Sequence, residues 1–99
     1  MQKFDVFEIA GDLYLVVQAE HLLELNTVVL LPILPSATLP PLTKLTVDVK
    51  VAGSSFRVRT HMPLTVQAQR LRHLVPVHQL SAEEGQKVMD GLYAILWGF

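Results

Sequence analysis

The chain has 99 residues, of which 51% are hydrophobic, 17% charged and 7% aromatic. This length suits one domain with a modest core, and the apolar composition excludes intrinsic disorder as the main state. The formal net charge is -1, whereas proteins that track nucleic-acid phosphates normally carry a basic excess. The chain has no cysteine, which excludes disulfides, thiol nucleophiles and cysteine-type zinc sites and favours an intracellular setting.

No segment of the sequence has the pattern of a targeting or membrane-spanning element. The first residues lack an apolar signal core. The most apolar stretch, Val28–Leu34, contains Pro32 and is far shorter than the roughly 20 residues that cross a bilayer. We therefore expect a soluble cytoplasmic protein that does not act at a membrane.

The first half of the chain is predicted to form strands. Phe4–Ile9 and Leu13–Val17 flank a glycine-containing turn and form a plausible hairpin. Residues 21–25 fit either one helical turn or a loop. Thr27–Leu34 is a continuous β-branched and leucine run, as expected for a strand covered on both faces. Within this run Pro32 favours an edge position or a bulge.

The strand pattern continues to about residue 80. After an irregular loop at residues 36–43, further strands are predicted at Thr46–Val51, Phe56–Thr60 and Leu64–Gln69, with a short edge strand at Leu74–His78 limited by Pro76. A turn at residues 52–55 joins the first two of these strands into the clearest hairpin. The period of two places Arg57 and Arg59 on the same face of the second strand.

The pattern changes at Ser81, where a helix over about residues 82–99 is predicted. Ser81 and Glu84 have the spacing of a capping box. The apolar stripe of a helix laid on a sheet follows, at Val88, Leu92, Ile95 and Phe99. The sequence thus predicts one mainly β domain over residues 1–99, with a small twisted antiparallel sheet over about 3–80 and one C-terminal α-helix.

The sequence has no strong catalytic or metal-binding motif. The four histidines (His21, His61, His73 and His78) lack the spacing of metal ligands, and we interpret them as surface or loop residues. We expect no cofactor and no metal ion. Arg57 and Arg59 suit an acidic partner or phosphates, although a solvated sheet face is the simpler interpretation.

The aromatic end of the predicted helix points to an intermolecular role. At 100° per residue, Trp97 lies two residues and thus about 200° (equivalently about 160°) around the helix from both Ile95 and Phe99. Trp97 is therefore expected to face away from the surface on which the apolar stripe packs. Tryptophan is strongly enriched among the residues that dominate binding energy at protein interfaces.

Several stretches of the sequence resemble the CcdB toxins, the DNA-gyrase poisons of bacterial toxin–antitoxin pairs. The resemblance lies in Met1–Phe4, Leu15–Glu20, Val29–Ile33 and, above all, Leu96–Phe99. It implies a barrel-like, SH3-like antiparallel sheet with a C-terminal helix. It also implies a homodimer that is not an enzyme and that acts in the bacterial cytoplasm.

The resemblance further implies a target and the residues that bind it. CcdB toxins bind the gyrase A subunit and trap the complex of gyrase with cleaved DNA. The matching gyrase-binding residues in this chain are Trp97, Gly98 and Phe99, with Leu96, Tyr93, His21 and Leu22 beside them.

The resemblance also implies a cognate antitoxin. Its disordered C-terminal tail wraps the toxin, and the antitoxin complex autoregulates transcription, so that DNA is contacted only indirectly. Arg57 and Arg59 are candidate antitoxin-binding residues.

Two other functions stay open at this point. A MazF-like endoribonuclease toxin would need a cationic groove with acid–base groups, and Arg57, Arg59 and His61 are the candidate cluster. The other alternative is a non-toxic homologue that acts only as a dimeric antitoxin-binding module. Phe99, Tyr93 and His21 depart from the family pattern, in which the chain usually ends in isoleucine, and a member with an altered target or weak toxicity is therefore also considered.

Overall fold

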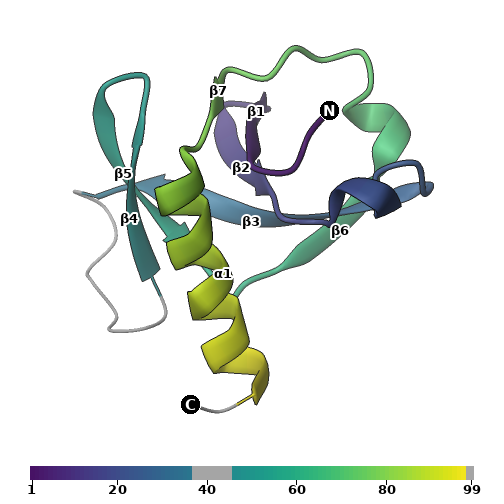
Figure 1. Cartoon of the computed structure of the whole chain (residues 1–99). Helices are drawn as coiled ribbons and strands as arrows, with labels where there is room; N and C mark the ends of the chain where they lie inside the picture. Colours follow the sequence, from purple (N-terminus) through teal and green to yellow (C-terminus); the bar gives the residue numbers. More distant parts are fainter. Residues whose placement is uncertain (37–45, 98–99) are drawn as a thin grey trace.

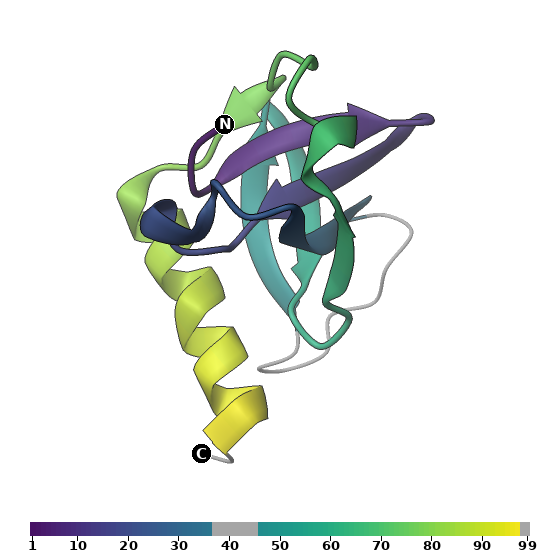
Figure 2. The ribbon, with the colours of Figure 1, turned by 90° about the vertical axis from the view of Figure 1, so that its right-hand side faces the viewer.

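A curled antiparallel sheet with one long helix across it forms the fold (Figures 1 and 2). The computed structural model describes residues 1–36 and 46–97. Its elements are β1 (Asp5–Ile9), β2 (Asp12–Val16), η1 (Glu20–Leu22), β3 (Thr27–Pro35), β4 (Thr46–Val51), β5 (Ser54–Arg59), β6 (Leu64–Gln67), η2 (Ala68–Arg70), β7 (His78–Gln79) and α1 (Ala82–Trp97). The strands follow the order β4-β5-β3-β2-β1-β7, with β6 also paired to β3. The predicted fold class, mainly β with one C-terminal α-helix, is confirmed.

Two tight turns set the register of the hairpins. Ala10 and Gly11 join β1 to β2 with φ angles of 53° and 88°, and Ala52 and Gly53 join β4 to β5 with 51° and 85°. Two central residues with positive φ form the type I′ turn, whose twist matches that of the flanking strands. The second turn is shorter than the predicted 52–55, because β5 already begins at Ser54.

Pro32 does not lie on an edge strand, so that part of the sequence prediction is wrong. β3 pairs with β2 along one side, and along the other side it pairs first with β6 and then with β5. The pairing with β6 ends at Leu30 and the pairing with β5 begins at Ile33. Pro32 therefore sits where β3 changes partners, a position at which the missing N–H interrupts neither ladder.

Two hydrophobic cores lie on opposite faces of the sheet. The first core includes Val6, Leu15, Leu31, Ile33, Val49, Val58 and, from the helix, Val88. The second core includes Phe7, Val16, Leu23, Val28, Leu30, Ala68 and Leu71. Because successive strand residues point to opposite faces, the continuous apolar run of β3 supplies both cores.

The first turn of α1 fixes the helix on the sheet. The amide of Glu84 donates to Ser81 Oγ at 3.1 Å, as the capping box predicts, and the Glu84 carboxylate accepts from the backbone N–H of Lys50 at 2.8 Å. One turn later Val88 is fully buried in the first core. Between them Gly85 lies so close to the Phe4 ring that a β-carbon would overlap it. No helix in residues 1–36 and 46–97 is long and apolar enough to cross a membrane.

Two weaker predictions are settled by the structure. The ambiguous segment 21–25 contains a helical turn, since η1 covers Glu20–Leu22. The predicted edge strand Leu74–His78 has the wrong bounds, because β7 contains only His78 and Gln79. Pro76 prevents strand pairing up to residue 76, and the amide of Val77 then donates to Val6 O at 2.8 Å. The predicted loop at 36–43 lies, beyond Ser36, outside the described residues.

We predict that Gly85→Ala destabilises the protein. In an unobstructed helix this change stabilises by about 1 kcal/mol, but here the new methyl group overlaps the Phe4 ring. Overpacking of this kind costs about 1–3 kcal/mol, which urea unfolding would measure. The penalty should shrink in a Phe4→Leu background. Equal or higher stability of Gly85→Ala alone would contradict the tight contact.

Candidate functional site

The last turns of α1 present three large apolar side chains to solvent. Tyr93 is 49% exposed, Leu96 68% and Trp97 71%. Residues three and four positions apart neighbour each other on a helix surface, so these three form one patch, which we call the α1 patch. The expected outward orientation of Trp97 is confirmed.

The opposite face of α1 explains why the α1 patch is exposed. At about 100° per residue, Trp97 lies about 180° from Val88, which is fully buried in the first core. Leu92 packs partly buried against the same core. Both views show the end of α1 projecting beyond the strands (Figures 1 and 2). Two further predicted site residues, Gly98 and Phe99, lie outside the described residues.

His21 and Leu22 are exposed on η1, and a buried glutamine holds this turn in place. Gln18 Nε2 donates to Leu22 O at 2.6 Å and to Thr27 O at 3.1 Å. Its Oε1 accepts from the amide of Val29 at 3.1 Å. One amide side chain thus ties both ends of the η1 segment to the start of β3. The role of Gln18 was not predicted from the sequence, although a polar residue directly after the apolar run Leu13–Val17 is a usable signal.

The predicted gyrase-binding residues fall into two separate groups. Lys3 donates its amide to Glu20 Oε1 at 3.0 Å, and the adjacent Phe4 contacts Gly85 in the first turn of α1. Figures 1 and 2 both place η1 level with the beginning of α1, whereas Trp97 is at its far end. One chain therefore does not bring the η1 residues and the α1 patch together.

Arg57 on β5 is engaged within the protein. Its Nε lies 2.9 Å from Asp48 Oδ1, and its Nη1 donates to Ser36 O at 2.7 Å. Its side chain is only 18% exposed. The expectation of a freely solvated arginine face is therefore wrong at this position, because the neighbouring strand supplies a carboxylate.

Arg59 is half-buried beside a histidine. Its Nη2 lies 3.5 Å from His61 Nε2, so the juxtaposition expected from their parity is present. Its Nε is buried and has no hydrogen-bond partner in the part of the chain that the structure describes. No group of three or more histidine, aspartate or glutamate side chains suited to a metal ion occurs among the same residues.

Comparison with known proteins gives a family and a shared fold. A family model described as "CcdB protein" matches residues 3–98. An endoribonuclease from Mycobacterial species is 13% identical with a TM-score of 0.81, over 98% of this chain and 91% of that one. An endoribonuclease in complex with its cognate antitoxin, also from Mycobacterial species, is 12% identical with a TM-score of 0.80, over 100% and 97%.

A further solved structure belongs to the same structural group. The MazE–MazF structure (Form-III) from Deinococcus radiodurans is 14% identical with a TM-score of 0.76, over 98% of this chain and 96% of that one. At such identities the likeness shows the fold alone. No curated protein matches the chain.

We predict that Trp97→Ala leaves the stability of the fold unchanged. The indole is 71% exposed, and substitutions of exposed side chains usually change the free energy of unfolding by less than about 0.5 kcal/mol. Val88→Ala on the opposite face should cost about 2 kcal/mol, because it removes fully buried methyl groups. Urea unfolding compares the two variants. A large loss for Trp97→Ala would show that the indole supports the fold.

Proposed function

The chain belongs to the CcdB family of toxin–antitoxin toxins, and we propose that it binds the DNA gyrase A subunit through the α1 patch. In this proposal the bound toxin traps gyrase with cleaved DNA. Gly98 and Phe99 continue the binding segment beyond Trp97. The observation that carries the proposal is the exposure of Trp97, at 71%, on a helix face fixed by packing on the other side.

The exposed indole suits a binding anchor on energetic grounds. A large aromatic side chain has about 150–250 Å² to bury, and the 71% of Trp97 that is exposed corresponds to about 110–180 Å², or about 3–4 kcal/mol at about 25 cal/mol per Å² before costs. Ordering one side chain at an interface costs about 0.5–1.5 kcal/mol. Because α1 already holds the backbone of Trp97, no additional backbone ordering at this residue reduces the gain.

We infer that the toxin works as a homodimer in the bacterial cytoplasm. Within one chain the α1 patch lies at the end of α1, whereas η1, which carries His21 and Leu22, is level with the beginning of that helix. A second copy of the chain offers a way to place one group of each kind beside the other. The proposed complex therefore joins two toxin chains to gyrase, and it reaches DNA only through its protein partners.

We also infer a cognate antitoxin with a disordered C-terminal tail. Arg59 is the better candidate of the two arginines for contacting this tail, because Arg57 already pairs with Asp48. A tail that folds on binding covers a large surface at moderate affinity, which suits reversible neutralisation. In our proposal the toxin–antitoxin complex autoregulates transcription.

Gyrase binding is tested by Trp97→Ala, which should weaken affinity for the purified gyrase A subunit by about 30-fold or more. That loss corresponds to an interface hot spot of about 2 kcal/mol. Val75→Ala is the matched control, since Val75 is 83% exposed but lies outside α1. The toxin should also cause gyrase-dependent cleaved DNA to accumulate, and Trp97→Ala should abolish this effect. Equal gyrase affinity for both variants would contradict the assignment.

A second candidate function is RNA cleavage, favoured by the 3.5 Å approach of Arg59 Nη2 to His61 Nε2. In that case His61 serves as the acid–base group and Arg59 stabilises the phosphate charge. Our proposal is instead that the protein is not an enzyme. RNA cleavage by the purified protein that is lost in His61→Ala and kept in Trp97→Ala would favour the second candidate.

A further inference from the structure

Among residues 1–36 and 46–97, β6 pairs with β3 alone, which leaves its other edge open. The amide of Ala68 donates to Asn26 O at 2.7 Å, and the register places Val66 opposite Val28 on β3. Because bonding alternates along an antiparallel pair, the backbone groups of Thr65 and Gln67 face away from β3. Apart from the ladder to β3, the backbone groups of Thr65 and Gln67 make no hydrogen bond to residues 1–36 and 46–97.

An apolar hollow lies on one face of β6. It has a volume of about 250 Å³ and is lined by Ile9, Ala10, Asp12, Tyr14, Leu30, Leu64, Val66 and Arg70. Most of its apolar side chains belong to the second core or pack against it, so the hollow lies at the surface of that core. Leu64 and Val66 line it from β6, and Arg70 follows on η2.

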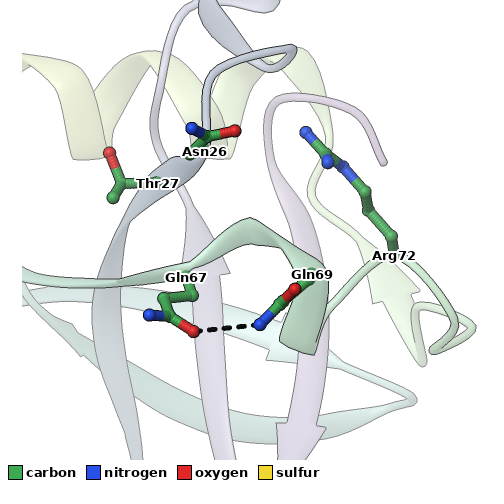
Figure 3. Close-up of a pocket in the computed structure, with 5 residues that line it drawn as sticks. All are labelled: Asn26, Thr27, Gln67, Gln69 and Arg72. Carbon is green, nitrogen blue, oxygen red and sulfur yellow. Dashed lines mark hydrogen bonds between the residues drawn. The ribbon is translucent and has the colours of Figure 1, made fainter.

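A polar hollow lies over the other face, since Gln67 and Val66 point to opposite sides of the strand. It has a volume of about 400 Å³ and is lined by Asn26, Thr27, Gln67, Gln69 and Arg72 (Figure 3). Gln69 Nε2 donates to Gln67 Oε1 at 3.1 Å, and Arg72 Nη2 donates to Leu25 O at 3.0 Å. The side chains around this hollow are amides, one hydroxyl and one guanidinium.

We propose that the open edge of β6 binds an extended acidic peptide as an added strand. The outward backbone groups of Thr65 and Gln67 supply the main-chain hydrogen bonds of such an addition. Side chains of an added strand alternate between the two faces of the sheet. Apolar side chains therefore enter the apolar hollow, and alternate polar or acidic side chains reach the polar hollow.

The charge around β6 selects acidic over basic peptides. Arg70 and Arg72 both follow directly on the strand, and both are exposed. Asp12 also lines the apolar hollow, and it comes from the start of β2. The residues that line the two hollows thus include two guanidinium groups and one carboxylate, a net positive charge beside the added strand.

This surface is distinct from the α1 patch. None of the lining residues of the two hollows belongs to α1. The inference therefore goes beyond gyrase binding, and it holds or fails independently of Trp97.

The test uses the full chain and a fluorescent nine-residue peptide that alternates glutamate and valine. A peptide alternating lysine and valine is the matched control. The acidic peptide should bind at least about tenfold more tightly than the basic control peptide. This ratio of affinities should fall as salt is added. Hydrogen exchange at the amides of Thr65 and Gln67 should slow when the acidic peptide is present. Equal binding of both peptides, or unchanged exchange at these amides, overturns the proposal.

Two pairs of variants locate the peptide. Thr65→Pro removes an outward N–H without touching the ladder to β3, and Thr65→Val keeps that N–H. Thr65→Pro should lower the affinity for the acidic peptide by about tenfold, which corresponds to the loss of one main-chain hydrogen bond. Thr65→Val should leave this affinity unchanged. Arg70→Glu should reverse the preference between the two peptides, whereas Arg70→Lys should keep it. Thermal unfolding confirms that each variant is folded.

Two further outcomes complete the test. Trp97→Ala should bind the acidic peptide with the same affinity as the unchanged chain. A loss of binding in this variant would indicate that the peptide binds at the α1 patch instead. Protection of the Thr65 and Gln67 amides that rises with protein concentration in the absence of peptide would show a second copy on the edge. Either result overturns the proposal.

Discussion

The orientation of the α1 patch depends on the close packing of the first turn of α1 against Phe4 and Lys50. Gly85 lets the helix backbone approach the Phe4 ring, and Glu84 caps both its own helix and the exposed amide of Lys50. With Val88 buried one turn later, the rotation of α1 about its axis is fixed. The orientation of Trp97 follows from that rotation, because each residue of a regular helix is turned by a fixed angle relative to the one before it. The α1 patch is thus positioned by contacts at the opposite end of the helix.

Local patterns predicted the elements, and long-range pairing decided what those patterns could not. The capping box, the alternation in β4 and β5 and the two glycine turns each act within a few residues, so they can be read from the sequence. The role of Pro32 depends on β5 and β6, which lie more than twenty residues later in the chain and share one side of β3. No local signal shows that a strand changes partners at its proline.

In the candidate site, too, local features could be predicted from the sequence, and features that depend on long-range pairing could not. The outward face of Trp97 follows from the helical period, so the sequence predicted it. The engagement of Arg57 depends on the Ala52–Gly53 turn, which sets Asp48 directly opposite it. The part played by Gln18 requires three backbone groups that only the fold brings together. The open edge of β6 could not be predicted from the sequence either, because it depends on which of the described strands pair with β6.

The two proposed binding surfaces use different physics, and this bears on how neutralisation works. The α1 patch offers side-chain area on a preorganised helix, whereas the β6 edge offers main-chain bonds and a charge preference. Sites that share no residues usually contribute additively to binding. An antitoxin that engages only the β6 edge would leave the α1 patch exposed, so it would also have to extend over α1 to displace gyrase. A tail long enough to reach both surfaces gains from effective concentration, because binding at one surface holds the rest of the tail near the other. Neutralisation by such a tail therefore needs neither surface to bind tightly alone.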